Sequence, residues 1–160
     1  MHPFFLCLGY LLGSGFASFV IGRLLPKTWP KAVGIFRCFP HEREGRIYEK
    51  LGIRKWQNRV PDMSKIFSFI MPRKKLTTDF RDKLPRMIRE TCVAELVHEA
   101  LCLTGLLCLW LWPGWGGALM ALANCLVNTP FVLIQRYNRP RLVRLQGRVQ
   151  SRRSAELVGM

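Results

Sequence analysis

Hydrophobic residues are concentrated in two long uncharged runs rather than spread evenly along the chain. The first run extends from Pro3 to Gly22, and the second covers the 36 residues from Ala100 to Gln135. Uncharged apolar runs of about 18 residues or more are typical of membrane-spanning helices, because a helix rises about 1.5 Å per residue and the hydrocarbon core is about 30 Å thick. The pattern therefore argues against a soluble enzyme.

The second run is too long for one span and contains its own break. Residues 113–117 read Pro-Gly-Trp-Gly-Gly, a composition that forms turns, and tryptophans gather around them as at a membrane–water interface. We expect transmembrane helices at residues 3–22, 94–112 and 117–134, the last two forming a hairpin. The predicted fold class is an α-helical integral membrane protein with about three spans and a basic cytoplasmic cap.

The first run resembles a retained membrane anchor more than a signal peptide. No Lys or Arg precedes it, and no small-x-small cleavage site ends it. Within it, Gly9, Gly13 and Ala17 recur every four residues. Such a stripe of small residues suits close contact between helices, although membrane helices also tolerate glycine without using it in this way.

The charged residues indicate an orientation in the membrane. The chain has 25 Lys and Arg against 10 Asp and Glu, a net charge of +15. Residues 23–93 hold 18 basic and 7 acidic residues and residues 136–160 hold 7 and 1, whereas the hairpin tip has no charge. The positive-inside rule then predicts a multi-pass cell-membrane protein with the N-terminus outside and the segments 23–93 and 135–160 in the cytoplasm. Topology and attraction to anionic lipid explain the charge, so nucleic acid is not an expected partner.

The segment 23–93 is divided by six prolines into short pieces. Helices are expected at residues 46–53 and 79–94, and the apolar stretch 63–71, flanked by basic residues, fits either an interfacial segment or a core strand. About 70 residues form a small core only by leaning on the membrane or its helices. We therefore expect a membrane-hugging cap, and a disordered polar tail at 146–160.

No metal site or disulfide framework is expected. The six cysteines form no CxxC pair and show no Cys/His ligand spacing. Glu95-x-x-His98 is half of a di-iron motif, but the chain contains no second copy.

The most costly polar residues lie where the second span begins. Thirteen uncharged residues separate Glu99 from Pro113, about 20 Å of helix and too few to cross the membrane. The helix must begin earlier, which places Glu95 and His98 at the cytoplasmic boundary, where ionisable groups are candidates for function. The two share a helical face, so the carboxylate can orient the imidazole as a general base. A structural pair that anchors the interface is the alternative.

Two further polar groups flank this one in the sequence. Asn128 is followed by the segment QRYNRPR at residues 135–141, whose arginines can bind phosphate or carboxylate. Positive-inside anchoring would explain the arginines, but not the polar residues interleaved with them. Residues 56–62 (WQNRVPD) form a third group, which a surface turn would also explain. The candidate substrate-binding residues are Trp56, Asp62, Asn128, Gln135, Arg136, Tyr137, Asn138, Arg139 and Arg141.

The order of these groups along the chain resembles a known family. Tyr48, Trp56 and Pro61-Asp62 are followed by residues 90–98 (ETCVAELVH), by Asn128-x-Pro130 and by QRYNRPR. This pattern resembles the glycosyl-4,4'-diaponeurosporenoate acyltransferases over about Tyr48 to Leu145. Val93 and Asn58 depart from it, since Arg and Asp are expected there.

Members of that family are small bacterial membrane proteins of carotenoid biosynthesis. The resemblance implies an acyltransferase that moves a fatty acyl group, with acyl-CoA as co-substrate and no bound cofactor, to a sugar hydroxyl of a glycosylated carotenoid or other glycolipid. His98 would be the general base and Glu95 its partner, while Asn128 or Asn138 would stabilise the oxyanion or position the sugar. The alternative is a non-catalytic membrane subunit that docks partners through its basic cap.

The resemblance also implies how the donor is held and attacked. Acyl-CoA is cytoplasmic, so the site would face the cytoplasm, and the apolar spans would accept the acyl tail. The arginines Arg136, Arg139 and Arg141, with Arg86 and Arg89, would hold the CoA phosphates. No cysteine lies in a convincing nucleophile context, which favours direct transfer over an acyl-enzyme.

Overall fold

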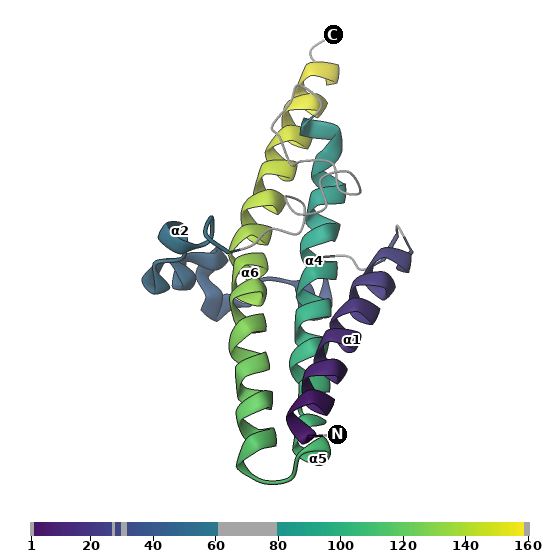
Figure 1. The fold of residues 1–160 in the computed structure, drawn as a ribbon. Coiled ribbons are helices and arrows are strands. Elements are labelled where there is room, and N and C mark those ends of the chain that lie inside the picture. The colour runs from purple at the N-terminus through teal and green to yellow at the C-terminus, as the bar shows by residue number, and fades with distance from the viewer. Residues whose placement is uncertain (1, 27, 30–31, 61–79, 159–160) are drawn as a thin grey trace. The chain divides into compact units, whose positions relative to one another are not determined.

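The computed structural model describes residues 2–26, 28–29, 32–60 and 80–158, and this part of the chain forms helices without any strand (Figure 1). Three helical stretches are long and apolar enough to cross a membrane: Pro3–Leu24, Asp82–Leu111 and Trp115–Glu156. The predicted fold class, a helical protein with three membrane-spanning helices, is confirmed. The elements in chain order are α1 (Pro3–Leu24), η1 (Gly34–Phe36), η2 (Pro40–Leu51), α2 (Ile53–Trp56), α4 (Phe80–Gly105), α5 (Cys108–Leu111) and α6 (Trp115–Val158).

The chain divides into two compact units, and both long helices α4 and α6 contribute to each. The first unit comprises residues 1–30 and 92–135, and the second comprises residues 31–91 and 136–160. Residues 31–91, most of the segment that the sequence marks as a basic cap, therefore belong to one unit with the C-terminal half of α6.

The first unit is built from α1, the apolar half of α4, α5 and the first half of α6. Its small core contains Cys7, Cys108 and Ala121, and the Tyr10 hydroxyl donates a hydrogen bond to the Thr104 carbonyl at 2.9 Å. Figure 1 shows α1 lying beside α4 and α5. Many large apolar side chains of these helices point outward, among them Trp110, which is 87% exposed. An outward apolar surface of this kind suits contact with lipid.

The glycine stripe of α1 makes no close contact with another described helix, which favours the second of the two interpretations, glycine tolerance in a membrane helix. A Cβ atom built at Gly9 or Gly13 meets no described atom within 4 Å, whereas one at Gly22 would lie 3.1 Å from Val97 Cγ2 on α4. The residues of α1 that do pack, such as Cys7, lie on another face. Gly9 follows Cys7 by two residues, which turns an α-helix by about 200°, so the stripe faces away from the contact that Cys7 makes.

Several element boundaries differ from those predicted. The helix expected at 79–94 is the start of α4, which continues to Gly105 in place of a separate span beginning at residue 94. The tail 146–160, expected to be disordered, is helical to Val158, because adding a residue to an existing helix costs far less than starting one. The stretch 63–71 lies outside the described residues. Gly114, with φ of 93°, forms the predicted turn before α6.

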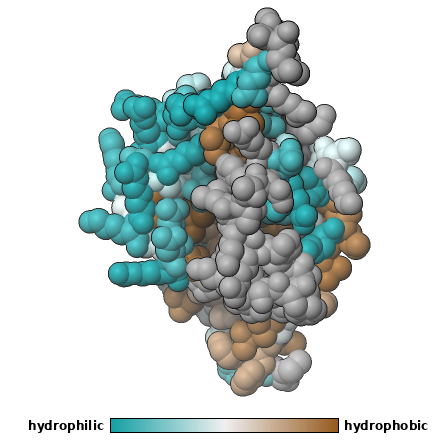
Figure 2. Space-filling model, turned by 90° about the horizontal axis from the view of Figure 1, so that it is seen from above, coloured by the Kyte–Doolittle hydropathy of each residue, from teal (hydrophilic) through white to brown (hydrophobic). Residues whose placement is uncertain are grey.

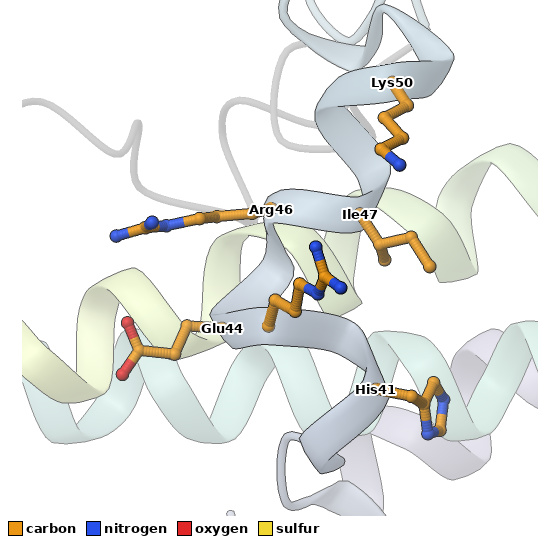
Figure 3. A pocket seen from close by; sticks show the side chains of 6 residues that line it. His41, Glu44, Arg46, Ile47 and Lys50 are labelled. Carbon is orange, nitrogen blue, oxygen red and sulfur yellow. The ribbon is translucent and has the colours of Figure 1, made fainter.

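The second unit packs short 3-10 segments against the polar half of α6. Residues 46–53, predicted as one α-helix, belong to η2 and the start of α2. In Figure 1 these elements lie beside α6, and in Figure 2 hydrophilic side chains project from the edge that they form. A hollow of about 560 Å³ opens on the surface of η2 (Figure 3).

Candidate active site

His98 lies in the first unit, half-buried on α4, and two side chains of α6 hold its imidazole. Nδ1 lies 2.8 Å from Asn128 Oδ1. The ring also stacks on Phe131, with centroids 4.4 Å apart and planes inclined by 10°. A hydrogen bond in the ring plane and a stacked face together fix both the position and the rotation of the imidazole.

The amide of Asn128 determines which imidazole nitrogen carries the proton. Its Nδ2 donates to the Asn124 carbonyl at 2.9 Å and to Asn124 Oδ1 at 3.2 Å, and Asn124 Nδ2 in turn donates to the Leu101 carbonyl at 2.8 Å. Since Asn128 donates through Nδ2, its Oδ1 accepts from His98 Nδ1–H. The lone pair of the neutral imidazole is therefore on Nε2, the nitrogen available as a base.

A glycine makes room for this chain of amides. Gly105 is the last residue of α4, and a Cβ atom there would lie 2.2 Å from Asn124 Nδ2 and 3.1 Å from its Cγ. Any larger residue would push the Asn124 amide away from Leu101 and Asn128. Asn124 is thus a functional candidate that the sequence analysis missed. Its signal was present, because it lies one helical turn before Asn128 in an otherwise apolar stretch.

Glu95 does not take the orienting role that we expected. Its side chain is fully buried on α4, one turn before His98. Among the residues that the structure describes, however, the side chain hydrogen-bonded to the imidazole is Asn128. A spacing of three residues places Glu95 and His98 on one face of α4, but Nδ1 points across to α6, so the orienting group comes from the neighbouring helix.

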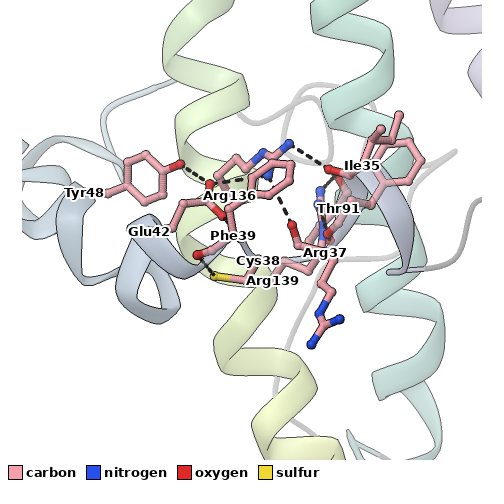
Figure 4. A network of polar contacts seen from close by, with 10 residues as sticks. Ile35, Arg37, Cys38, Phe39, Glu42, Tyr48, Thr91, Arg136 and Arg139 are labelled. Carbon is pink, nitrogen blue, oxygen red and sulfur yellow. Dashed lines mark hydrogen bonds and ion pairs between the residues drawn. The ribbon is translucent and has the colours of Figure 1, made fainter.

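The QRYNRPR segment begins at the end of the first unit and continues into the second, where its arginines bind the cap. Arg139 is only 3% exposed. It donates to Thr91 Oγ1 and to the Thr91 carbonyl at 3.0 Å each, and to the Phe36 carbonyl at 2.8 Å (Figure 4). These three bonds use the planar fork of the guanidinium to join η1, α4 and α6 within this unit.

Arg136 forms the centre of a second polar group, also drawn in Figure 4. It donates to the Ile35 carbonyl at 2.9 Å and pairs with Glu42 Oε1 at 3.4 Å. Burial alone would raise the pKa of the Glu42 carboxyl, but hydrogen bonds from the Tyr48 hydroxyl and the Phe39 amide, with the charge of Arg136, hold that pKa below its usual value. Glu42 is thus an ionised carboxylate inside the cap.

The remaining members of the segment also contact cap residues. Arg141 pairs with Glu49 at 2.6 Å and lies over the Tyr137 ring, 3.6 Å from its centroid. Tyr137 is fully buried, and its hydroxyl accepts from Arg54 Nε at 3.1 Å. Arg136, Arg139 and Arg141 therefore each donate to acceptors within the second unit, which gives these arginines a structural role in addition to any contact with substrate.

The other predicted residues are more dispersed. Trp56 ends α2, half-buried, with its indole N–H donating to the Leu51 carbonyl at 2.9 Å. Gln135 and Asn138 are half-buried on α6, in the first and second unit respectively. Asp62 lies outside the described residues. Within the described ranges, no group of three His, Cys, Asp or Glu side chains could hold a metal ion.

Comparison with known proteins places this chain in a family. The family described as "Glycosyl-4,4'-diaponeurosporenoate acyltransferase" matches residues 32–148, which include the His98 group and the whole QRYNRPR segment. The protein belongs to this acyltransferase family. It is therefore an enzyme of acyl transfer, as the sequence pattern predicted.

Relatives that carry the family name come from Staphylococcus aureus. The glycosyl-4,4'-diaponeurosporenoate acyltransferase of strain N315 is 30% identical over 128 residues, which cover 77% of this chain and 74% of the relative. That of strain USA300 is similar to the same extent. The protein of the bovine strain RF122 / ET3-1 is 32% identical over 116 residues, covering 69% of this chain and 67% of its own. No solved structure matches the chain.

Proposed function

We propose that the protein transfers a fatty acyl group from acyl-CoA to a sugar hydroxyl of a glycosylated carotenoid acid. The names of its relatives support this substrate class. The observation that carries the proposal is the His98–Asn128–Asn124 chain, which leaves Nε2 of a fixed imidazole as a base among apolar helices. An apolar setting suits both an acyl chain and a carotenoid.

In the proposed reaction, His98 Nε2 takes the proton of the attacking hydroxyl. The sugar oxygen forms a bond to the thioester carbonyl carbon, and the tetrahedral intermediate then expels the CoA thiolate. The imidazolium returns its proton to the departing sulfur, so the products are the ester and CoA–SH, and the histidine is neutral again. One histidine in one tautomer serves both proton transfers.

Asn128 is proposed as a positioning residue and not as an oxyanion donor. Its Nδ2 already donates to the backbone carbonyl and to the side chain of Asn124, which leaves Oδ1 to hold the imidazole. Direct transfer is favoured over an acyl-enzyme, since Cys92 is fully buried and lies six residues before His98, on another face of α4. Glu95 is a buried candidate for a second role in the reaction, which a Glu95→Gln variant would test.

The proposed setting is the cell membrane. The distribution of positive charge supports an external N-terminus and a cytoplasmic cap and C-terminus, which matches the cytoplasmic supply of acyl-CoA. Membership of an enzyme family argues against the alternative of a non-catalytic docking subunit.

The test is the His98→Gln variant, assayed for acyl transfer in membranes that contain equal amounts of protein. Glutamine keeps a hydrogen-bonding side chain but removes the titratable nitrogen, so the rate should fall by about 10² to 10⁴, the usual effect of a positioned base. His2→Gln, at the exposed start of α1, is the matched control and should retain the rate. Full activity in His98→Gln would exclude the histidine as the base.

A further inference from the structure

The hollow on η2 is lined mainly by basic side chains. Its residues are His41, Arg43, Glu44, Arg46, Ile47 and Lys50. In Figure 3, His41, Ile47 and Lys50 leave the ribbon on one side, while Glu44 and Arg46 leave it on the other. The side chains that line the hollow therefore leave η2 in two directions, with Lys50 on one side and Arg46 on the other.

An unusual stretch of backbone builds this surface. Arg43 and Glu44 have φ of 47° and 57°, and Gly45 follows with φ of 86°. Left-handed conformations are unfavourable for residues other than glycine, so the surrounding structure must impose them. Contacts with α6 fix both ends of this stretch. Glu42, just before it, pairs with Arg136, and Gly45, at its end, packs so closely on α6 that a Cβ would lie 3.1 Å from the Tyr137 carbonyl oxygen.

The cations of the hollow differ from those of the QRYNRPR segment in having no internal partner. Among the described residues, no hydrogen bond or ion pair engages the side chains of Arg43, Arg46 or Lys50. The carboxylate that lines the hollow, Glu44, is neutralised by Arg144 at 2.8 Å. Three cations held around one concave surface repel one another, and an anion placed among them relieves that repulsion.

We propose that this hollow binds phosphate groups, specifically those of the nucleotide part of acyl-CoA. This inference rests on the proposed function for the identity of the donor. Coenzyme A carries a diphosphate and a ribose phosphate, which match several separate cations better than a single charge would. Arginine presents a planar fork to phosphate oxygens and lysine a point charge, so Arg43, Arg46 and Lys50 supply both modes of contact.

The test measures binding of coenzyme A itself, without acceptor or turnover. The full chain is purified in a neutral detergent and titrated calorimetrically with coenzyme A. The double variant Arg43→Gln/Lys50→Gln should raise the dissociation constant about tenfold or more. Lys55→Gln removes one charge, as Lys50→Gln does, at an exposed residue of α2 outside the hollow, and should leave the dissociation constant within about twofold of the parent. The single variant Lys50→Gln changes a residue outside the left-handed stretch of backbone. It should show part of the same loss of affinity even if Arg43→Gln disturbs the fold of the double variant.

A second titration, with short-chain phosphatidylglycerol in the same detergent, distinguishes the two sources of phosphate. Loss of coenzyme A binding in the hollow variants supports the donor as ligand. Loss of phosphatidylglycerol binding alone supports a phosphate site that takes lipid headgroups and overturns its assignment to the donor. Unchanged binding of both ligands overturns the phosphate site altogether. The binding test does not depend on turnover. A protein that binds coenzyme A through the hollow but shows no acyl transfer in a separate assay would therefore count against the proposed reaction and not against the hollow.

Discussion

Replacing Asn128 by leucine should slow acyl transfer by a factor of up to about ten without removing the protein from the membrane. Leucine has a similar volume but cannot accept the proton of His98 Nδ1, now 2.8 Å from the amide oxygen. A net hydrogen bond of about 1–1.5 kcal/mol then no longer favours the tautomer with a free Nε2. Since about 1.4 kcal/mol corresponds to a factor of ten in an equilibrium constant, the ratio of the reactive to the unreactive tautomer should fall by about that factor, which is the upper limit of the loss in rate.

The same change should have a separate cost in stability. Asn124 Oδ1 would lose its donor, and leaving a buried polar atom unpaired costs about 1–3 kcal/mol. Initial rates are therefore compared at equal amounts of folded protein in membranes, over a range of donor and acceptor concentrations. The loss should appear in kcat, while KM for both substrates stays near the parent value, because a positioning residue acts through the base.

Thr129→Val is the matched control for this experiment. Its hydroxyl is exposed and donates only to the Cys125 carbonyl of its own helix, at 2.7 Å. It should retain the parent rate. If Asn128→Leu also retained the parent kcat, the tautomer would not be set by Asn128, and the assignment of Nε2 as the base would be refuted.

Three further changes test the parts that surround this group. Gly105→Ala should lower kcat severalfold by displacing the Asn124 amide, with an unchanged rate refuting that amide's part in the chain. Arg139→Lys should lower the melting temperature in detergent, because the three donors of an ammonium lie on one nitrogen and cannot reach acceptors that are spaced for the three nitrogens of a guanidinium, and each buried acceptor left unpaired costs about 1–3 kcal/mol. The pKa of Glu42 is lower in the folded protein than its usual value of about 4.3, so the ionised carboxylate stabilises the cap at pH values above about 4.3. This stabilisation is lost as the pH falls through the lower, folded pKa. Melting temperatures measured across that range should fall on acidification, and less steeply in Glu42→Gln.

The membrane-spanning helices were predictable because their signal is compositional. A run without charge and a Pro-Gly break define spans and hairpin whatever the detailed packing. The lengths of α4 and α6 were harder to predict, since both helices continue past the ends of the apolar runs into the second unit. Their extensions are stabilised by contacts with residues far away in the chain, such as Arg139 with Phe36, and no local pattern reveals such contacts.

The candidate site also has one part that the sequence predicts and one part that depends on packing. The cost of placing His98 near a membrane marked it as a candidate, and this reasoning needs only the sequence. The sequence alone could not identify the partner of the His98 imidazole. Glu95 is one turn away on the same helix and Asn128 is at a similar depth in the third span, and only the rotation of α6 relative to α4 decides between them. The structure selects Asn128, and through it Asn124 and Gly105, as the residues that fix the imidazole.

The arginines illustrate why residue type alone does not identify a ligand site. Arg139 and Arg43 carry the same side chain, and both lie in the range that matches the family. Arg139 is buried and donates to three acceptors inside the cap, whereas Arg43 lines an exposed hollow and its side chain has no partner among the described residues. A buried arginine that has exchanged water for three protein acceptors gains little from a phosphate, since binding it would break those bonds. A cation with no acceptor loses only water, so the phosphates of a ligand are better sought on η2 than in the segment whose sequence first suggested them.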